Sequence, residues 1–226
     1  MIRILLAAIG GLATVFACGN ARAADEPVAG TTYMLVEPPQ PTSTGDKIEV
    51  LEVFSFACPA CNAFQPAMAE IKKSLPADAE VRYLPASFRS DEDWPVFQRA
   101  FFTAQALGIE DKSHQAMFDA VWKDKTLAIY DESNRKLVDP LPDINAIARF
   151  YAKFGVKPAD FVATAGSFAI NTKMKRADEQ IKAYGVDSTP TVIVNGKYRV
   201  TPRTAGGWDQ MVSVVEYLVH KEQAAK

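Results

Sequence analysis

The sequence contains few of the residues from which metal sites and nucleic-acid sites are built. Its 226 residues include only three cysteines and two histidines, and the histidines, His114 and His220, lie far apart. The formal net charge is only -2, and no run of five or six like charges occurs. A nucleic-acid-binding protein, which usually carries a basic patch, is therefore not expected. The length allows one large domain, or one domain with an insertion.

Long hydrophobic runs are also lacking, except at the N-terminus. There Arg3 precedes an apolar stretch, Ile4 to Ala17, and Ala21-Arg22-Ala23 follows as a small-x-small cleavage site. The stretch is shorter than the roughly 20 residues that a spanning helix needs. We therefore predict that residues 1–23 are a signal peptide and that the mature protein is exported, most simply to a bacterial periplasm. Because both arginines are removed, the formal charge would change from -2 to -4.

Cys18 leaves a second interpretation of the N-terminus open. Val15 to Cys18 loosely resembles a lipoprotein processing site, which would place a lipid on Cys18. Phe16 is bulkier than the small residue usual at that position, so cleavage after Ala23 is favoured. The mature chain would then keep two cysteines, in a compartment where disulfides form and persist.

Before residue 91 the sequence predicts strands around one helix. Strand character occurs at 31–36, at 47–56 and at 81–84, and the second of these runs is apolar enough for a strand buried on both faces. Pro59 is suited to the first turn of a helix, and apolar residues follow at helical spacing. Pro66 lies inside this helix and is expected to kink it.

From residue 91 to 165 the pattern predicts helices only. Ser113 is expected to cap one of them, which places His114 at the surface. Later, residues 168–184 predict a long helix, 191–194 and 198–201 a hairpin through Asn195-Gly196, and the end of the chain an amphipathic helix. We predict an α/β fold in which residues 24–90 and 166–226 form one domain and residues 91–165 a helical insertion.

Cys58-Pro59-Ala60-Cys61 is a C-x-x-C motif at the junction of the buried strand and the first helix. A helix N-terminus presents unpaired N–H groups and the positive end of the helix dipole, so the pKa of Cys58 should fall. The thiolate is the nucleophile in disulfide exchange. Cys61 lies one turn further on, where it can resolve a mixed disulfide, so the pair predicts redox chemistry.

Two other roles for the cysteine pair are weaker. A structural zinc site needs two more Cys or His ligands, and the mature chain offers only two distant histidines. A purely structural disulfide would close so short a loop that it would stabilise little. No metal or cofactor is expected.

These features together resemble the DsbA family of periplasmic disulfide oxidases, which have a thioredoxin-like fold with a helical insertion. The resemblance rests on Phe54-Ser55-Phe56 before the C-x-x-C motif, on Ser188-Thr189-Pro190 before a strand, and on Val194-Asn195-Gly196-Lys197-Tyr198. It covers almost all of the mature chain.

The resemblance implies roles for single residues. Cys58 would be the solvent-facing nucleophile, supported by Pro59, and Cys61 the buried partner. Pro190 would be a cis-proline opposite the cysteine pair, and the Thr189 backbone would pair with an extended substrate, with Ala60 beside it.

Glu52, in the middle of the buried strand, resembles the family's acid beneath the active site. Burial should raise the pKa of its carboxyl, which could then exchange a proton with Cys61. The alternative is a Glu that faces the surface at the strand's edge.

Ala60 departs from the pattern of strongly oxidising members, which carry histidine between proline and the second cysteine. A histidine can donate a hydrogen bond to the thiolate, whereas alanine cannot. Ala60 should therefore give a less depressed Cys58 pKa and a less oxidising couple.

The leading functional hypothesis is an enzyme that donates the Cys58–Cys61 disulfide to folding exported proteins and is reoxidised by a membrane partner of the DsbB type. The alternatives are a periplasmic reductase or isomerase, and a non-catalytic peptide-binding chaperone. An isomerase of the familiar kind would usually carry a separate dimerisation domain, for which this chain has no room. The protein is expected to be a monomer.

Overall fold

The computed structural model describes residues 26–131, 133 and 136–226, so the predicted signal peptide and Cys18 lie outside the described residues. A five-stranded sheet forms its centre, in the order β1-β7-β6-β2-β3. The strands are β1 Met34–Leu35, β2 Ile48–Phe54, β3 Ala79–Pro85, β6 Thr191–Val194 and β7 Tyr198–Val200. β2 runs parallel to β3 and antiparallel to β6, and β7 is antiparallel to both of its neighbours.

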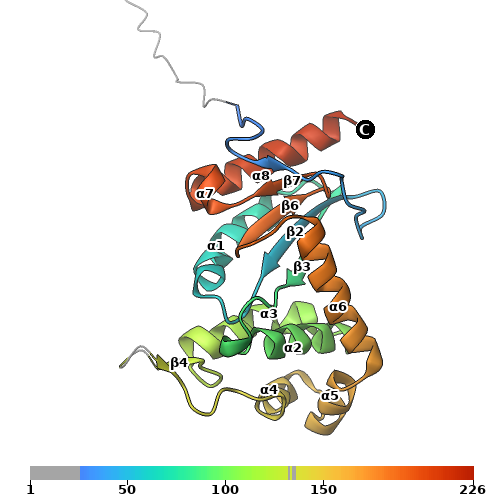
Figure 1. Cartoon of the computed structure of the whole chain (residues 1–226). Coiled ribbons are helices and arrows are strands. Elements are labelled where there is room, and N and C mark those ends of the chain that lie inside the picture. Colours follow the sequence, from blue (N-terminus) through green and yellow to red (C-terminus); the bar gives the residue numbers. More distant parts are fainter. Residues whose placement is uncertain (1–25, 132, 134–135) are drawn as a thin grey trace, which may run out of the picture.

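The longest helices lie on the two faces of the sheet (Figure 1). One face packs against α1 (Pro59–Ser74) and α8 (Trp208–Ala224), and the other against α6 (Phe168–Ala183) and the inserted helices. The inserted helices are α2 (Trp94–Ala106), α3 (Glu110–Phe118), α4 (Ile144–Tyr151) and α5 (Pro158–Ala165). The remaining helical segments are short: the 3-10 helices Ser90–Glu92 and Ala152–Phe154, the π-helix Asp119–Lys123, and α7 (Pro202–Ala205).

β2 is the strand that fixes the site, and all seven of its residues are buried. A strand covered on both faces is predominantly apolar, which accounts for its Ile, Val, Leu and Phe residues, and the two buried glutamates, Glu49 and Glu52, are the exceptions. α1 starts directly after it and buries Phe64, Met68 and Ile71, as the spacing predicts, and it continues through Pro66. Among the described residues, no helix is both long and apolar enough to cross a bilayer.

Several local predictions are wrong. The first strand is confined to Met34–Leu35, and residues 91–165 include a small hairpin, β4 (Tyr130–Asp131) with β5 (Lys136–Leu137), as well as helices. α3 begins at Glu110 and not at Ser113, since Glu110 and Asp111 complement the positive end of the helix dipole in its first turn. Ser113 is therefore an interior residue, whose hydroxyl donates to the Ile109 carbonyl at 2.7 Å.

A candidate active site built from Cys58, Cys61 and a cis-proline

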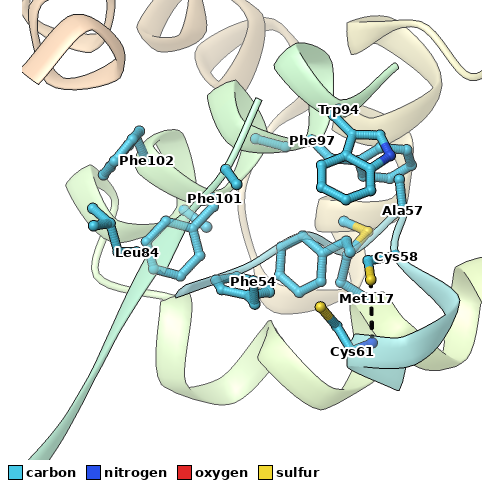
Figure 2. Packing of buried hydrophobic residues seen from close by; sticks show 14 of the residues in the cluster. Phe54, Ala57, Cys58, Cys61, Leu84, Trp94, Phe97, Phe101, Phe102 and Met117 are labelled. Atoms are coloured by element: carbon cyan, nitrogen blue, oxygen red, sulfur yellow. Dashed lines mark hydrogen bonds between the residues drawn. The ribbon is translucent and has the colours of Figure 1, made fainter. Parts of the chain in front are cut away.

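Cys58 is the N-cap of α1, and Pro59 occupies the first turn of this helix. The Cys61 backbone N–H donates to Cys58 Sγ at 3.3 Å, the contact drawn as a dashed line in Figure 2. The sulfur thus takes the place that a Ser or Asp oxygen has at other helix N-termini. Both cysteines are free thiols, so these contacts belong to the dithiol form.

Thr189 and Pro190 approach Cys58 from a segment 131 residues further along the chain. The Thr189–Pro190 peptide bond is cis, as the resemblance implies. Thr189 Oγ1 donates to Cys58 Sγ at 3.3 Å, and the Thr189 carbonyl lies 3.7 Å from the same sulfur. The structure therefore brings Thr189, which was predicted to bind the substrate, into contact with Cys58, the predicted nucleophile. A role was expected for the Thr189 backbone, but not for its hydroxyl.

The two thiols differ strongly in acidity. The pKa of Cys58 is lowered to about 6, first by a hydrogen bond from the Cys61 thiol, then by Thr189 and by the backbone N–H groups of Cys61 and Ala60, while burial opposes them. Burial is the main cause that raises the pKa of Cys61. The pair therefore has one sulfur that ionises near neutral pH and one that holds its proton. Cys58 was expected to face the solvent, but its side chain is only 5% exposed. Cys61 is fully buried, as expected.

The Cys58 thiolate should be directly visible in a pH titration. We expect the thiolate absorbance of the reduced protein to appear with a midpoint near the pKa of about 6. A Cys58→Ser variant should show no such step in this range, because the pKa of Cys61 is raised. A midpoint at the ordinary thiol pKa of about 8.5 would contradict this description of the site.

Glu52 lies at the centre of β2, opposite Tyr83 of β3 and Val192 of β6. Its side chain is fully buried, so the alternative of a surface-facing Glu52 is wrong. Among the described residues neither carboxyl oxygen has a hydrogen-bond partner. Burial raises the pKa of Glu52 to about 8, with a further contribution from the negative charge of Cys58, and the Gln65 amide opposes both. Glu52 in turn helps to raise the pKa of Cys61.

Polar contacts and apolar packing hold the backbone around the motif. Trp122 Nε1 donates to the Phe56 carbonyl at 2.8 Å, and Gln65 Nε2 donates to the Cys61 carbonyl at 3.1 Å. Phe54, Trp94 and Met117 belong to the same buried apolar cluster as the two cysteines (Figure 2). Neither polar contact was foreseen from the sequence. Ala60 is half-buried in the first turn of α1 and has no polar side chain to offer the thiolate.

His114 corrects another expectation, since it is buried and not at the surface. Its ring stacks on Tyr83 at 4.1 Å between centroids and lies 5.0 Å from Phe54. Neither ring nitrogen has a hydrogen-bond partner among the described residues. Burial, and then the charge of Lys72, lower the pKa of His114 to about 3. The error follows from reading Ser113 as an exposed cap, whereas His114 shares the buried face of α3 with Met117 and Phe118.

This buried imidazole should contribute a loss of stability in acid that a variant can isolate. Between its ordinary pKa of 6.5 and the folded value of about 3, the unfolded chain binds a proton that the folded chain does not. The contribution of His114 to stability is thus lost as the pH falls through this range, by about 2 kcal/mol at pH 5. The free energy of unfolding of His114→Phe, minus that of the unaltered protein, should therefore increase by about 2 kcal/mol from pH 7 to pH 5 in denaturant unfolding. For the matched control, His220→Gln, which changes an exposed imidazole of α8, this difference should not change with pH. An unchanged slope in His114→Phe would contradict the assignment.

In the described part of the chain, no three His, Cys, Asp or Glu side chains come together as metal ligands. What the arrangement can do is disulfide exchange, because it holds a stabilised thiolate, a second sulfur one turn away, and a buried carboxyl on the adjacent strand.

Comparisons with known proteins agree with this geometry. The Thioredoxin family model matches residues 47–214. The thiol:disulfide interchange protein DsbA of Pseudomonas aeruginosa is 36% identical over all of this chain and 99% of its own length, and that of Azotobacter vinelandii is 32% identical with full coverage of both. The crystal structure of the oxidoreductase DsbA from Xylella fastidiosa has a TM-score of 0.76 at 30% identity, covering 88% of this chain and 98% of that one. The Pseudomonas aeruginosa DsbA structure has a TM-score of 0.72 at 35% identity, covering 88% and 95%.

The expected fold and enzyme class are therefore confirmed: the sheet is that of a thioredoxin fold, helices are inserted into it, and its sequence relatives are thiol:disulfide interchange proteins. By these likenesses the chain belongs to the DsbA family and is a protein disulfide oxidoreductase.

Proposed function

We propose that this oxidoreductase works as a disulfide donor for exported proteins in the periplasm. The observation that carries the proposal is the pKa of Cys58, lowered to about 6 beside a Cys61 whose pKa is raised. A stabilised Cys58 thiolate favours the reduced form, which makes the disulfide form the stronger oxidant. The same thiolate is a good leaving group when a substrate's second thiol attacks. The reductase or isomerase and the chaperone are not favoured, since the relatives that match the chain over its full length are thiol:disulfide interchange proteins DsbA.

The reaction proceeds in two exchanges. A substrate thiolate attacks Cys58 Sγ of the disulfide, the new S–S bond forms, and Cys61 leaves as a thiolate. Cys61 then takes up a proton, for which the buried Glu52 carboxyl, with its pKa of about 8, is the proposed donor. A second substrate thiolate attacks the substrate sulfur of the mixed disulfide, and Cys58 leaves as a thiolate. The substrate has lost two electrons, which the pair now holds as a Cys58 thiolate and a Cys61 thiol, and Glu52 regains its proton from the solvent.

The remaining parts of the proposal concern where and with whom the protein acts. Residues 1–23 would direct export and be removed, with lipidation of Cys18 the less favoured alternative. Residues 91–165 would be the insertion within a domain formed by 24–90 and 166–226. Ala60, Thr189 and Pro190 would contact the substrate. A membrane oxidase of the DsbB type would restore the disulfide of a monomeric protein.

The redox equilibrium of the mature protein with glutathione tests the direction of electron flow. We expect the pair to be half-reduced in a buffer well above thioredoxin's potential of about -270 mV, read by thiol trapping. The informative variant is Ala60→His. An added hydrogen bond to the thiolate should shift the equilibrium toward the reduced form by about tenfold. If the unaltered pair stays oxidised down to thioredoxin's potential, a reductase or isomerase role replaces the oxidase.

A further inference from the structure

A cavity of about 450 Å³ opens beside the cis-proline, between the Thr189–Pro190 segment, β1, β7 and α7. Thr189 lines it, and the hydroxyl of the same residue donates to Cys58 Sγ at 3.3 Å. Thr189 therefore connects the cavity with the reactive sulfur. A chain segment that brings a cysteine to Cys58 along the Thr189–Pro190 segment would pass beside the cavity.

Positive charge predominates in this cavity. Arg199 and Arg203 line it, against a single carboxylate, Asp187. Asp187 Oδ1 already accepts a hydrogen bond from the hydroxyl of Ser188, at 3.0 Å. Within the part of the chain that the structure describes, neither guanidinium forms an ion pair with a carboxylate. Both arginines thus retain N–H donors for a ligand.

The two arginines are held differently. Arg199, on β7, is half-buried, and its Nη1 donates to the Tyr184 carbonyl at 3.4 Å. The guanidinium lies against Gly185, where an added Cβ would be only 2.8 Å from Nη1. Arg203, on α7, is exposed and free to follow a ligand. One fixed and one adaptable guanidinium suit a carboxylate, which arginine can bind through two parallel hydrogen bonds.

The occupant that fits is an extended peptide. The Thr189 N–H pairs with no acceptor in the described residues, so the edge of this segment is available for strand-like pairing. In an extended peptide, side chains alternate between two directions, so residues beside the substrate cysteine point either into the cavity or away from it. We propose that Arg199 and Arg203 select substrate cysteines that have acidic residues close to them in sequence. This inference rests on the proposed function, because it assumes that the oxidised pair accepts protein thiols as substrates.

The test uses the oxidised, mature protein and two short blocked peptides, each with one cysteine flanked by glutamates or by lysines. The selectivity is the rate of mixed-disulfide formation with the glutamate peptide divided by that with the lysine peptide. Differences in peptide thiol pKa cancel when the selectivities of two protein variants are compared. We expect Arg199→Gln/Arg203→Gln to lower the selectivity about five- to tenfold, and Arg203→Gln alone about two- to threefold. At about 1 M salt the difference should largely disappear.

The matched control is Arg176→Gln, which removes an equal charge from an exposed position on α6, outside the cavity. Its selectivity should equal that of the unaltered protein. The inference is overturned if Arg176→Gln acts like Arg203→Gln, or if the Arg203 variants lower both peptide rates by one factor. Arg203 is exposed and makes no ion pair in the described structure, so its variant also tests the idea should the Arg199 variant fail to fold. If neither peptide is oxidised, the proposed function fails, and the inference fails with it.

Discussion

Replacing Cys58 by serine is expected to reduce disulfide exchange with a peptide thiol by roughly a thousandfold or more, the scale on which removal of a catalytic nucleophile acts. A serine hydroxyl at this N-cap still accepts the Cys61 N–H bond, so the fold should be kept. The hydroxyl cannot ionise near neutral pH or form a disulfide, so the chemistry should be lost. The measurement is the rate of oxidation of a two-cysteine peptide, followed by mass spectrometry, together with a thermal unfolding curve.

The matched variant is Cys61→Ser, which should behave differently. Its Cys58 still reacts with an activated peptide disulfide, but no resolving sulfur remains, so a stable mixed disulfide at Cys58 should accumulate. If Cys61→Ser failed to form this adduct and Cys58→Ser formed it at Cys61, the assigned roles would be exchanged. A Cys58→Ser protein that kept its full effect on substrate folding would support the chaperone alternative instead.

The strand, helix start and turn that position the cysteine pair were predictable from the sequence, because the local preferences of their residues agree with their places in the folded protein. The run from Ile48 to Phe54 suits only a strand covered on both faces, and Pro59 marks the start of the next helix. Asn195-Gly196 likewise predicts the turn between β6 and β7, where both residues have positive φ. The amino-acid pattern alone therefore places the cysteine pair at a strand-to-helix junction.

Contacts between distant segments could not be predicted in the same way. The Thr189 hydroxyl meets Cys58 across 131 residues, and Trp122 reaches the Phe56 carbonyl from within the insertion. Nothing in the local sequence sets these distances. His114 shows the same limit, because its burial depends on how the whole of α3 is turned against the sheet. Glu52 is the exception, since its apolar neighbours on both sides already indicated burial.

Glu52 also offers the second large effect, in stability. Its folded pKa of about 8 lies above the ordinary 4.5, so below pH 4.5 the carboxyl is protonated in both states and its ionisation costs nothing. As the pH rises from 4.5 to 8, the unfolded chain releases this proton and the folded chain keeps it. The contribution of Glu52 to stability then falls by about 1.4 kcal/mol per pH unit, which is about 3 kcal/mol by pH 7, and the loss levels off above pH 8.

Glu52→Gln should remove this loss, because an amide does not titrate. The free energy of unfolding of the reduced variant, minus that of the unaltered protein, should increase by about 3 kcal/mol between pH 4.5 and 7, whatever the fixed effect of burying the amide. Denaturant unfolding at a series of pH values measures this difference.

The control is Glu49→Gln in the same strand. Glu49 is equally buried, but its carboxylate accepts hydrogen bonds from the Ser43 N–H at 2.8 Å and from the Ser43 hydroxyl at 2.5 Å, so this variant should be destabilised at pH 7. A Glu52→Gln difference that did not change with pH would show that the carboxylate is already charged in the folded protein, and Glu52 could then not be the proton donor to Cys61.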